Sequence, residues 1–160
     1  MKKLLVAVGC LLAVQGMAQA TIQEEVDMIR KMYGKTKKEL MTNYLKVPEA
    51  KATAFWGLYD EYEEARANLA KERMQLIADY AKGYETLNDE TANTLATSTL
   101  KNNMQLEKLY QKYYGKMKKQ VGALEAAKFF QVESYFQTAI RSEIQDAIPL
   151  IGEIDRTKKQ

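Results

Sequence analysis

Few residues of this chain have side chains that commonly carry out chemistry. The sequence of 160 residues contains no histidine and a single cysteine, Cys10. Histidine and cysteine are the usual general bases, nucleophiles and metal ligands of proteins. A glycine-rich phosphate loop and a Gly-x-Ser-x-Gly turn are also missing from the sequence. We therefore expect no enzymatic activity and no cofactor.

Carboxylates are the remaining candidates for a metal site. Asp60 and Glu61 lie four and three residues before Glu64, so each can share a helix face with it. A di-metal helical bundle also needs Glu-x-x-His pairs, and a calcium loop needs closely spaced aspartates. The sequence has neither. We therefore assign no metal site, and metal binding through carboxylates alone stays an open question.

Aromatic residues have the other informative spacing. When Val47 is aligned with Val121, Phe55 falls on Phe129 and Trp56 on Phe130. This internal similarity indicates two helix starts of the same kind. Arg66 lies close to the same apolar positions and can lay its stem along them. The residues that we predict to contact other proteins are Phe55, Trp56, Tyr59, Arg66, Phe129, Phe130 and Phe136. Core packing explains the same spacing equally well.

The elements that carry these residues are predicted to be long helices. From Asp89 to Leu124, apolar and small residues recur at steps of three and four, and the segment from Pro48 to Leu87 has a matching pattern. Between them lie Asn88 and Asp89, which suit a tight turn. Further helices are expected from Thr21 to Lys46, with a weak point at Gly34, and from Gly122 to Ile148. The expected fold is all-α, a long antiparallel helical hairpin elaborated to four helices.

The first twenty residues predict export. Lys2 and Lys3 precede an apolar run, and Ala18-Gln19-Ala20 forms a cleavage site. We therefore expect a cleaved signal peptide at 1–20, a single helical domain at 21–148 and a partly disordered tail at 149–160. A lipoprotein acylated at Cys10 is a less favoured alternative, because alanine occupies the lipobox position where leucine is preferred. After cleavage no transmembrane segment is expected.

The charge of the chain argues against nucleic acid as a partner. The 24 basic residues exceed the 21 acidic ones by three, and two of the basic residues belong to the signal peptide. A nearly neutral mature chain lacks the basic surface that nucleic-acid binding requires. We therefore expect proteins, not nucleic acids, as partners.

The chain resembles the small exported helical proteins of the Spy, CpxP, ZraP and CnrX type. The matching stretches are Lys46 to Lys51 and Leu124 to Lys128, which lie at helix starts like the paired Leu-Thr-x-x-Gln motifs of that family. The first stretch keeps a Pro-Glu pair but has neither the threonine nor the glutamine. The resemblance implies a periplasmic, dimeric, chaperone-like protein of the envelope stress response. It equally implies a sensor or regulatory subunit that binds one specific envelope partner. The metal sites of that family depend on histidine and are not carried over.

Overall fold

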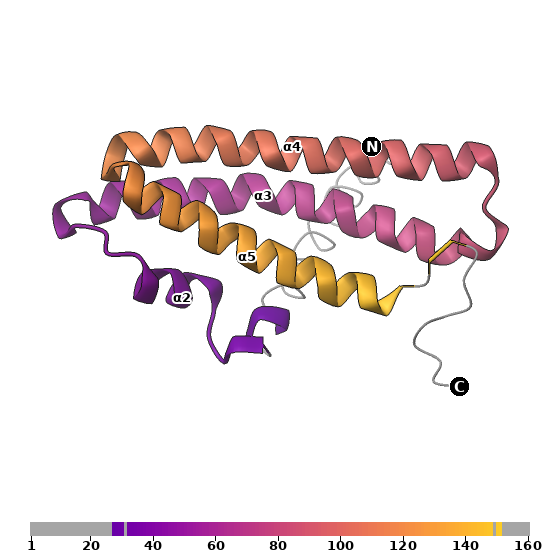
Figure 1. Ribbon diagram of the computed structural model, residues 1–160, viewed down its shortest axis with the longest axis horizontal. Helices are drawn as coiled ribbons and strands as arrows, with labels where there is room; N and C mark the ends of the chain where they lie inside the picture. Colours follow the sequence, from indigo (N-terminus) through magenta and orange to yellow (C-terminus); the bar gives the residue numbers. More distant parts are fainter. Residues whose placement is uncertain (1–26, 31, 149, 152–160) are drawn as a thin grey trace, which may run out of the picture.

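The computed structural model of the chain describes residues 27–30, 32–148 and 150–151. Residues 27–30 and 32–33 are helical. They are followed by α2 (Lys37–Tyr44), α3 (Glu49–Gly83), the short 3-10 helix η1 (Tyr84–Thr86), α4 (Asp89–Val121) and α5 (Ala123–Ala147) (Figure 1). The described residues contain no strand, which confirms the predicted all-α class. The predicted signal peptide and most of the predicted tail lie outside the described residues.

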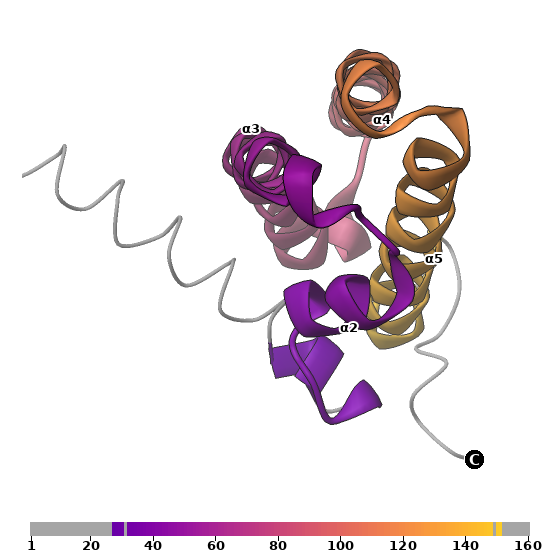
Figure 2. The same cartoon turned by 90° about the vertical axis from the view of Figure 1, so that its left-hand side faces the viewer.

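The long helices α3 and α4 lie side by side along most of their length, and α5 packs against α4 near the connection between them and slopes away from it toward its own end (Figure 1). A short connection joins α3 to α4, so the two run in opposite directions, and α5 returns along them. Seen from the end in Figure 2, α3, α4, α5 and α2 surround a common centre. No helix in the described part of the chain has both the length and the apolar composition needed to cross a membrane.

The helix boundaries follow from local caps. Asn88 begins α4 with a capping box, in which Thr91 N donates to Asn88 Oδ1 at 3.0 Å and Asn88 N donates to Thr91 Oγ1 at 3.1 Å. The helix before it ends at Gly83, earlier than the predicted Leu87, and η1 makes the connection. The first predicted helix is interrupted after Tyr33, where Gly34 has φ +67° and Thr36 caps α2.

Gly122 separates α4 from α5 and has φ +88°, a conformation that side chains with a Cβ rarely adopt. An added Cβ would meet no atom within 4 Å, so the cost of substitution is that of the backbone alone. We expect Gly122→Ala to lower the free energy of unfolding by about 1–2 kcal/mol. Gly57 lies inside α3 in equally open space, and Gly57→Ala should instead raise it by about 0.5–1 kcal/mol. Urea unfolding measures the free energy of unfolding of both variants. Equal effects would contradict a special backbone conformation at Gly122.

The hydrophobic core occupies one half of the bundle. Its buried members come from residues 27–30, from α2 and the residue after it, and from α3, α4 and α5: Ile29, Met41, Leu45, Phe55, Tyr59, Tyr62, Leu106, Tyr110, Tyr113, Met117, Val121, Ala126, Phe129, Phe136 and Ile140. In the other half, which spans residues 71–105 of α3, η1 and α4, Asn102 is the one buried residue among those described. The apolar residues of that half are therefore incompletely covered.

Candidate functional site

The structure places most of the predicted contact residues inside the core. Phe55, Tyr59, Arg66, Phe129 and Phe136 are each at most 5% exposed. The predicted similarity of the two helix starts brings Phe55 and Phe129 together, with ring centroids 6.3 Å apart in an edge-to-face arrangement. Side chains buried in this way can contact another protein only if the helices separate.

Two of the predicted residues keep partly exposed surface. Trp56 is half-buried beside Tyr59, and Lys38 Nζ lies 5.7 Å from the centre of the indole ring. Phe130 is 38% exposed, and its ring packs edge-on against Tyr110 at 5.5 Å. These two side chains lie next to the core and not within a cleft.

Arg66 belongs to a buried group of charges that the sequence analysis did not identify. Glu133 of α5 is fully buried, and Lys37 of α2 lies 2.8 Å from its Oε2. Tyr62 Oη donates to Glu133 Oε1 at 2.7 Å, and Arg66 Nε lies 3.9 Å from the same oxygen. Lys37 and Arg66 also pair with Glu63, at 2.6 and 3.4 Å. Two carboxylates and two cations therefore neutralise one another where α2, α3 and α5 meet.

The role of this charge group is to stabilise the fold, because its charges are occupied by one another and not by a ligand. Each of its charged side chains has an opposite charge within 4 Å, and core residues surround Glu133. The sequence signal was the position of Glu133 within the apolar stripe of α5. Its partners could not be found from the sequence, since Lys37 is 96 residues away.

We expect the charge group to make stability depend on acidic pH. Burial alone would raise the pKa of Glu63, but Lys37 and Arg66 outweigh burial and hold the pKa below its ordinary value of 4.5. A lowered carboxyl pKa stabilises the folded state fully above pH 4.5, and this stabilisation is lost as the pH falls through the folded-state pKa. Urea unfolding from neutral pH downward should show this loss, and it should be smaller in Glu63→Gln. Some loss of stability at acidic pH should remain in Glu63→Gln, because hydrogen bonds also lower the pKa values of Glu39 and Glu125.

Two of the three carboxylates considered for metal binding are paired with lysines. Asp60 pairs with Lys38 at 2.6 Å and Glu61 pairs with Lys116 at 2.9 Å. Within the described ranges, no three carboxylate, cysteine or histidine side chains are grouped so that they could hold a metal ion.

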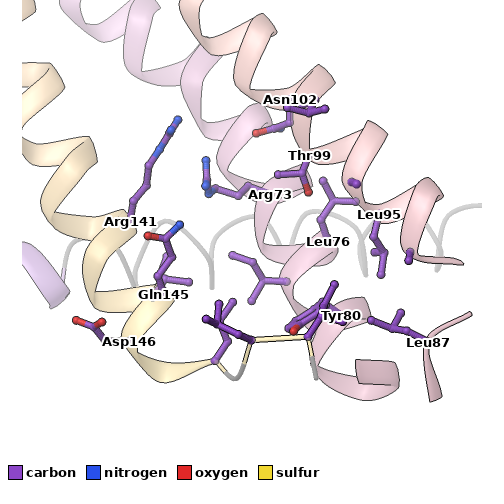
Figure 3. Close-up of a pocket in the computed structure, with 18 residues that line it drawn as sticks. Arg73, Leu76, Tyr80, Leu87, Leu95, Thr99, Asn102, Arg141, Gln145 and Asp146 are labelled. Carbon is purple, nitrogen blue, oxygen red and sulfur yellow. The ribbon is translucent and has the colours of Figure 1, made fainter. Parts of the chain in front are cut away.

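A large cleft opens in the half of the bundle where Asn102 is the one buried residue among those described. It has a volume of about 890 Å³ and lies between α3, α4 and the end of α5 (Figure 3). Most of its walls are apolar: Leu76, Ile77, Tyr80, Leu87, Ala92, Leu95, Ala96, Leu100, Ile144, Ile148, Leu150 and Ile151. Pockets of about 300–1,000 Å³ with apolar walls are typical of ligand-binding sites. This cleft is therefore the candidate functional site.

Polar groups gather at the inner end of the cleft, next to the core. Figure 3 shows Arg141 and Gln145 extending from α5, with Arg73 of α3 and Thr99 of α4 across from them. Arg73 Nη1 donates to Asn103 Oδ1 at 3.1 Å, which fixes one side of its guanidinium group. Asn102 Nδ2 donates to the carbonyl oxygen of Leu69 at 3.0 Å. The cleft thus combines apolar walls with a positively charged end.

The cleft could not be predicted from the sequence, because its residues continue the three- and four-residue spacing that favours closed helix contacts. Leu76 and Tyr80 lie in that spacing between Pro48 and Leu87, and Leu95 lies in it between Asp89 and Leu124. A possible signal was the high content of threonine and asparagine in the first half of α4, which lowers helix propensity and leaves fewer large side chains for packing.

Comparison of the chain with protein-family models, with curated proteins and with solved structures finds no match.

Proposed function

We propose that this chain is an exported, non-enzymatic binding module that holds apolar segments of other periplasmic proteins. The observation that supports the proposal is the open apolar cleft between α3, α4 and α5. Leu100 and Ile151 on its walls are 64% and 65% exposed. Contiguous exposed apolar surface of this kind is a frequent property of protein-interaction sites.

The position of the cleft fits a binding role better than the predicted aromatic surface does. Phe55, Tyr59 and Phe129 are needed to hold the core together and are buried. The cleft residues contribute less to the core. On α3 and α4, all of them except Asn102 keep some exposed surface. Ligand-binding regions commonly come from the parts of a fold with less packing. We therefore place the binding surface at the cleft, and leave Trp56 and Phe130 as secondary candidates.

The resemblance to exported stress proteins supports the same proposal. It implies a long helical hairpin and a dimer. Size-exclusion chromatography with light scattering tests the dimer directly, because a monomer mass would contradict it. Chaperone-like binding of many clients is the first form of the proposal, and a regulatory subunit with one envelope partner is the second.

The test is the aggregation of two unrelated denatured proteins, followed by light scattering with and without the purified chain from Thr21 onward. Suppression of both at a near-stoichiometric ratio supports the chaperone-like form. Suppression of neither contradicts it and favours a single dedicated partner, which cross-linking in the envelope would identify.

A matched pair of leucines connects the test to the cleft. Leu100 lies on the cleft wall, whereas Leu124, at the start of α5, is equally exposed at 69% and does not line the cleft. We expect Leu100→Gln to reduce suppression several-fold and Leu124→Gln to leave it unchanged. Both changes are on the surface and should alter stability by less than about 0.5 kcal/mol. Equal effects of the two variants would remove the cleft from the proposal.

A further inference from the structure

We infer that one end of the bundle docks on an anionic lipid surface. This end, which we name the basic end, consists of residues 46–51, where α2 is connected to α3, and residues 118–125, where α4 is connected to α5. Both connections face the viewer in Figure 2. The inference goes beyond the proposed function and does not involve the cleft, which lies in the other half of the bundle.

The basic end carries lysines that are not neutralised by the rest of the fold. Within the described part of the chain, four of its ammonium groups pair with no carboxylate, and all four side chains are exposed: Lys46, Lys51, Lys118 and Lys119. Glu125 is already engaged, since Lys128 Nζ lies 2.6 Å from its Oε1 and Lys46 N donates to its Oε2 at 3.0 Å. Glu49 is the other acidic residue of these two segments. The basic end therefore has an excess of positive charge.

The needs of the helix ends explain only part of this cluster. Lys118 and Lys119 lie in the last turn of α4, where a positive charge favours the helix dipole. Lys51 lies in the first turn of α3, where a positive charge is unfavourable. Lys46 lies before that helix begins. Because the local helix favours neither of these two lysines, a negatively charged partner is the better explanation for them.

The opposite end of the bundle is acidic. Glu85 of η1 and Asp89 and Glu90 in the first turn of α4 are exposed there, with Lys82 as the basic residue of the last turn of α3. Figure 1 shows this connection of α3 to α4 far from the basic end. Opposite charges are thus separated along the long axis of the bundle. Such a distribution orients a molecule on an anionic surface with its basic end first.

An exposed leucine favours a lipid surface over a soluble anion. Leu124 is 69% exposed and lies in the first turn of α5, within the basic end. Its exposed neighbours along the chain, Gly122 and Ala123, are uncharged, as are Pro48 and Ala50 of the other segment. At a membrane, a leucine can enter the boundary between headgroups and acyl chains while lysines contact the phosphates. A soluble phosphate would use the lysines and leave the leucine in water.

Docking through the basic end leaves the cleft in water. From Leu100 on the cleft wall to Val121, α4 advances roughly 30 Å at a rise of about 1.5 Å per residue. This separation exceeds the Debye length of about 8–10 Å at physiological ionic strength. The two surfaces can therefore be altered independently of each other.

Sedimentation with large lipid vesicles tests the inference. The protein is the purified chain from Thr21 onward, which lacks the apolar run of residues 4–14 that would bind lipid by itself. We expect binding to vesicles of equal parts phosphatidylglycerol and phosphatidylcholine, weakening as NaCl is added, and none to phosphatidylcholine alone. A lysine at an anionic surface contributes about fivefold in affinity, so the double variant Lys118→Gln and Lys119→Gln should bind about 20-fold more weakly. Leu124→Gln should bind several-fold more weakly.

A charge-matched double variant is the control. Lys82→Gln and Lys101→Gln remove the same amount of charge from exposed positions outside the basic end. This control should bind the anionic vesicles as tightly as the unmodified chain does. Urea unfolding of each variant shows that folding is retained.

The outcomes separate this inference from the proposed function. Absence of binding to anionic vesicles, equal binding to both kinds of vesicle, or equal losses in the two double variants would each overturn the inference. Binding of polyglutamate but of no vesicle would overturn the lipid surface and identify an acidic polypeptide as the partner. The proposed function is decided separately, because Leu100→Gln should leave vesicle binding unchanged and Leu124→Gln should leave the suppression of aggregation unchanged.

Discussion

Replacing Lys37 by methionine is expected to lower the free energy of unfolding by about 3–5 kcal/mol, although α2 is a helix of only eight residues. Lys37 Nζ lies 2.6 Å from Glu63 Oε1 and 2.8 Å from Glu133 Oε2. Without the lysine, the carboxyl group of Glu133 is fully buried with Arg66 at 3.9 Å as its remaining positive neighbour. A buried charge that has lost its partner is among the most destabilising changes known in proteins.

The neighbouring Lys38 provides the control for this prediction. It pairs with Asp60 at 2.6 Å, but the two side chains are 49% and 60% exposed. Exposed pairs contribute about 0–1 kcal/mol, so Lys38→Met should have little effect. Equal losses in the two variants, measured by urea unfolding at neutral pH, would contradict a special role of the buried group. Adding Glu133→Gln to Lys37→Met should recover part of the loss, because it removes the uncompensated charge.

Phe129→Ala is expected to lower the free energy of unfolding by about 3–5 kcal/mol, a loss typical of a large side chain removed from a packed core. Phe129 is 1% exposed. Its ring makes edge-to-face contacts with Phe55, Tyr59 and Tyr62 of α3, at 6.3, 6.2 and 5.4 Å between ring centroids. Removal of the ring leaves a cavity between α3 and α5 that these large, rigid neighbours cannot easily fill.

Phe130 is the matched comparison, one residue along the same helix. It is 38% exposed and contacts the Tyr110 ring at 5.5 Å, so Phe130→Ala should cost only about 1 kcal/mol. Urea or thermal unfolding of the two variants distinguishes a core residue from a surface residue. A larger loss in Phe130→Ala than in Phe129→Ala would contradict the packing described for α5.

The sequence by itself determined the helices, because their signals are local. The three- and four-residue spacing of apolar side chains indicated α3, α4 and α5, and Asn88 and Gly122 marked where α4 begins and ends. A cap or a positive φ depends on a few neighbouring residues, so it can be recognised without the fold. The end of α3 was predicted less well, since Gly83 and η1 replace the last turn by a tighter one.

Only the tertiary structure decided which side of each helix is covered, and over what length. The same spacing continues through Phe55 and Tyr80 on α3, yet Phe55 is fully buried and Tyr80 lines an open cleft. The difference arises because α5 and α2 cover the first half of α3, whereas the half that contains Tyr80 borders the cleft. Burial of Glu133 with Lys37 and the placement of Arg141 and Arg73 on one cleft likewise join residues far apart in the chain. The position of a residue in the sequence fixes which face of its own helix the side chain lies on. The packing of the other helices determines whether that face is covered.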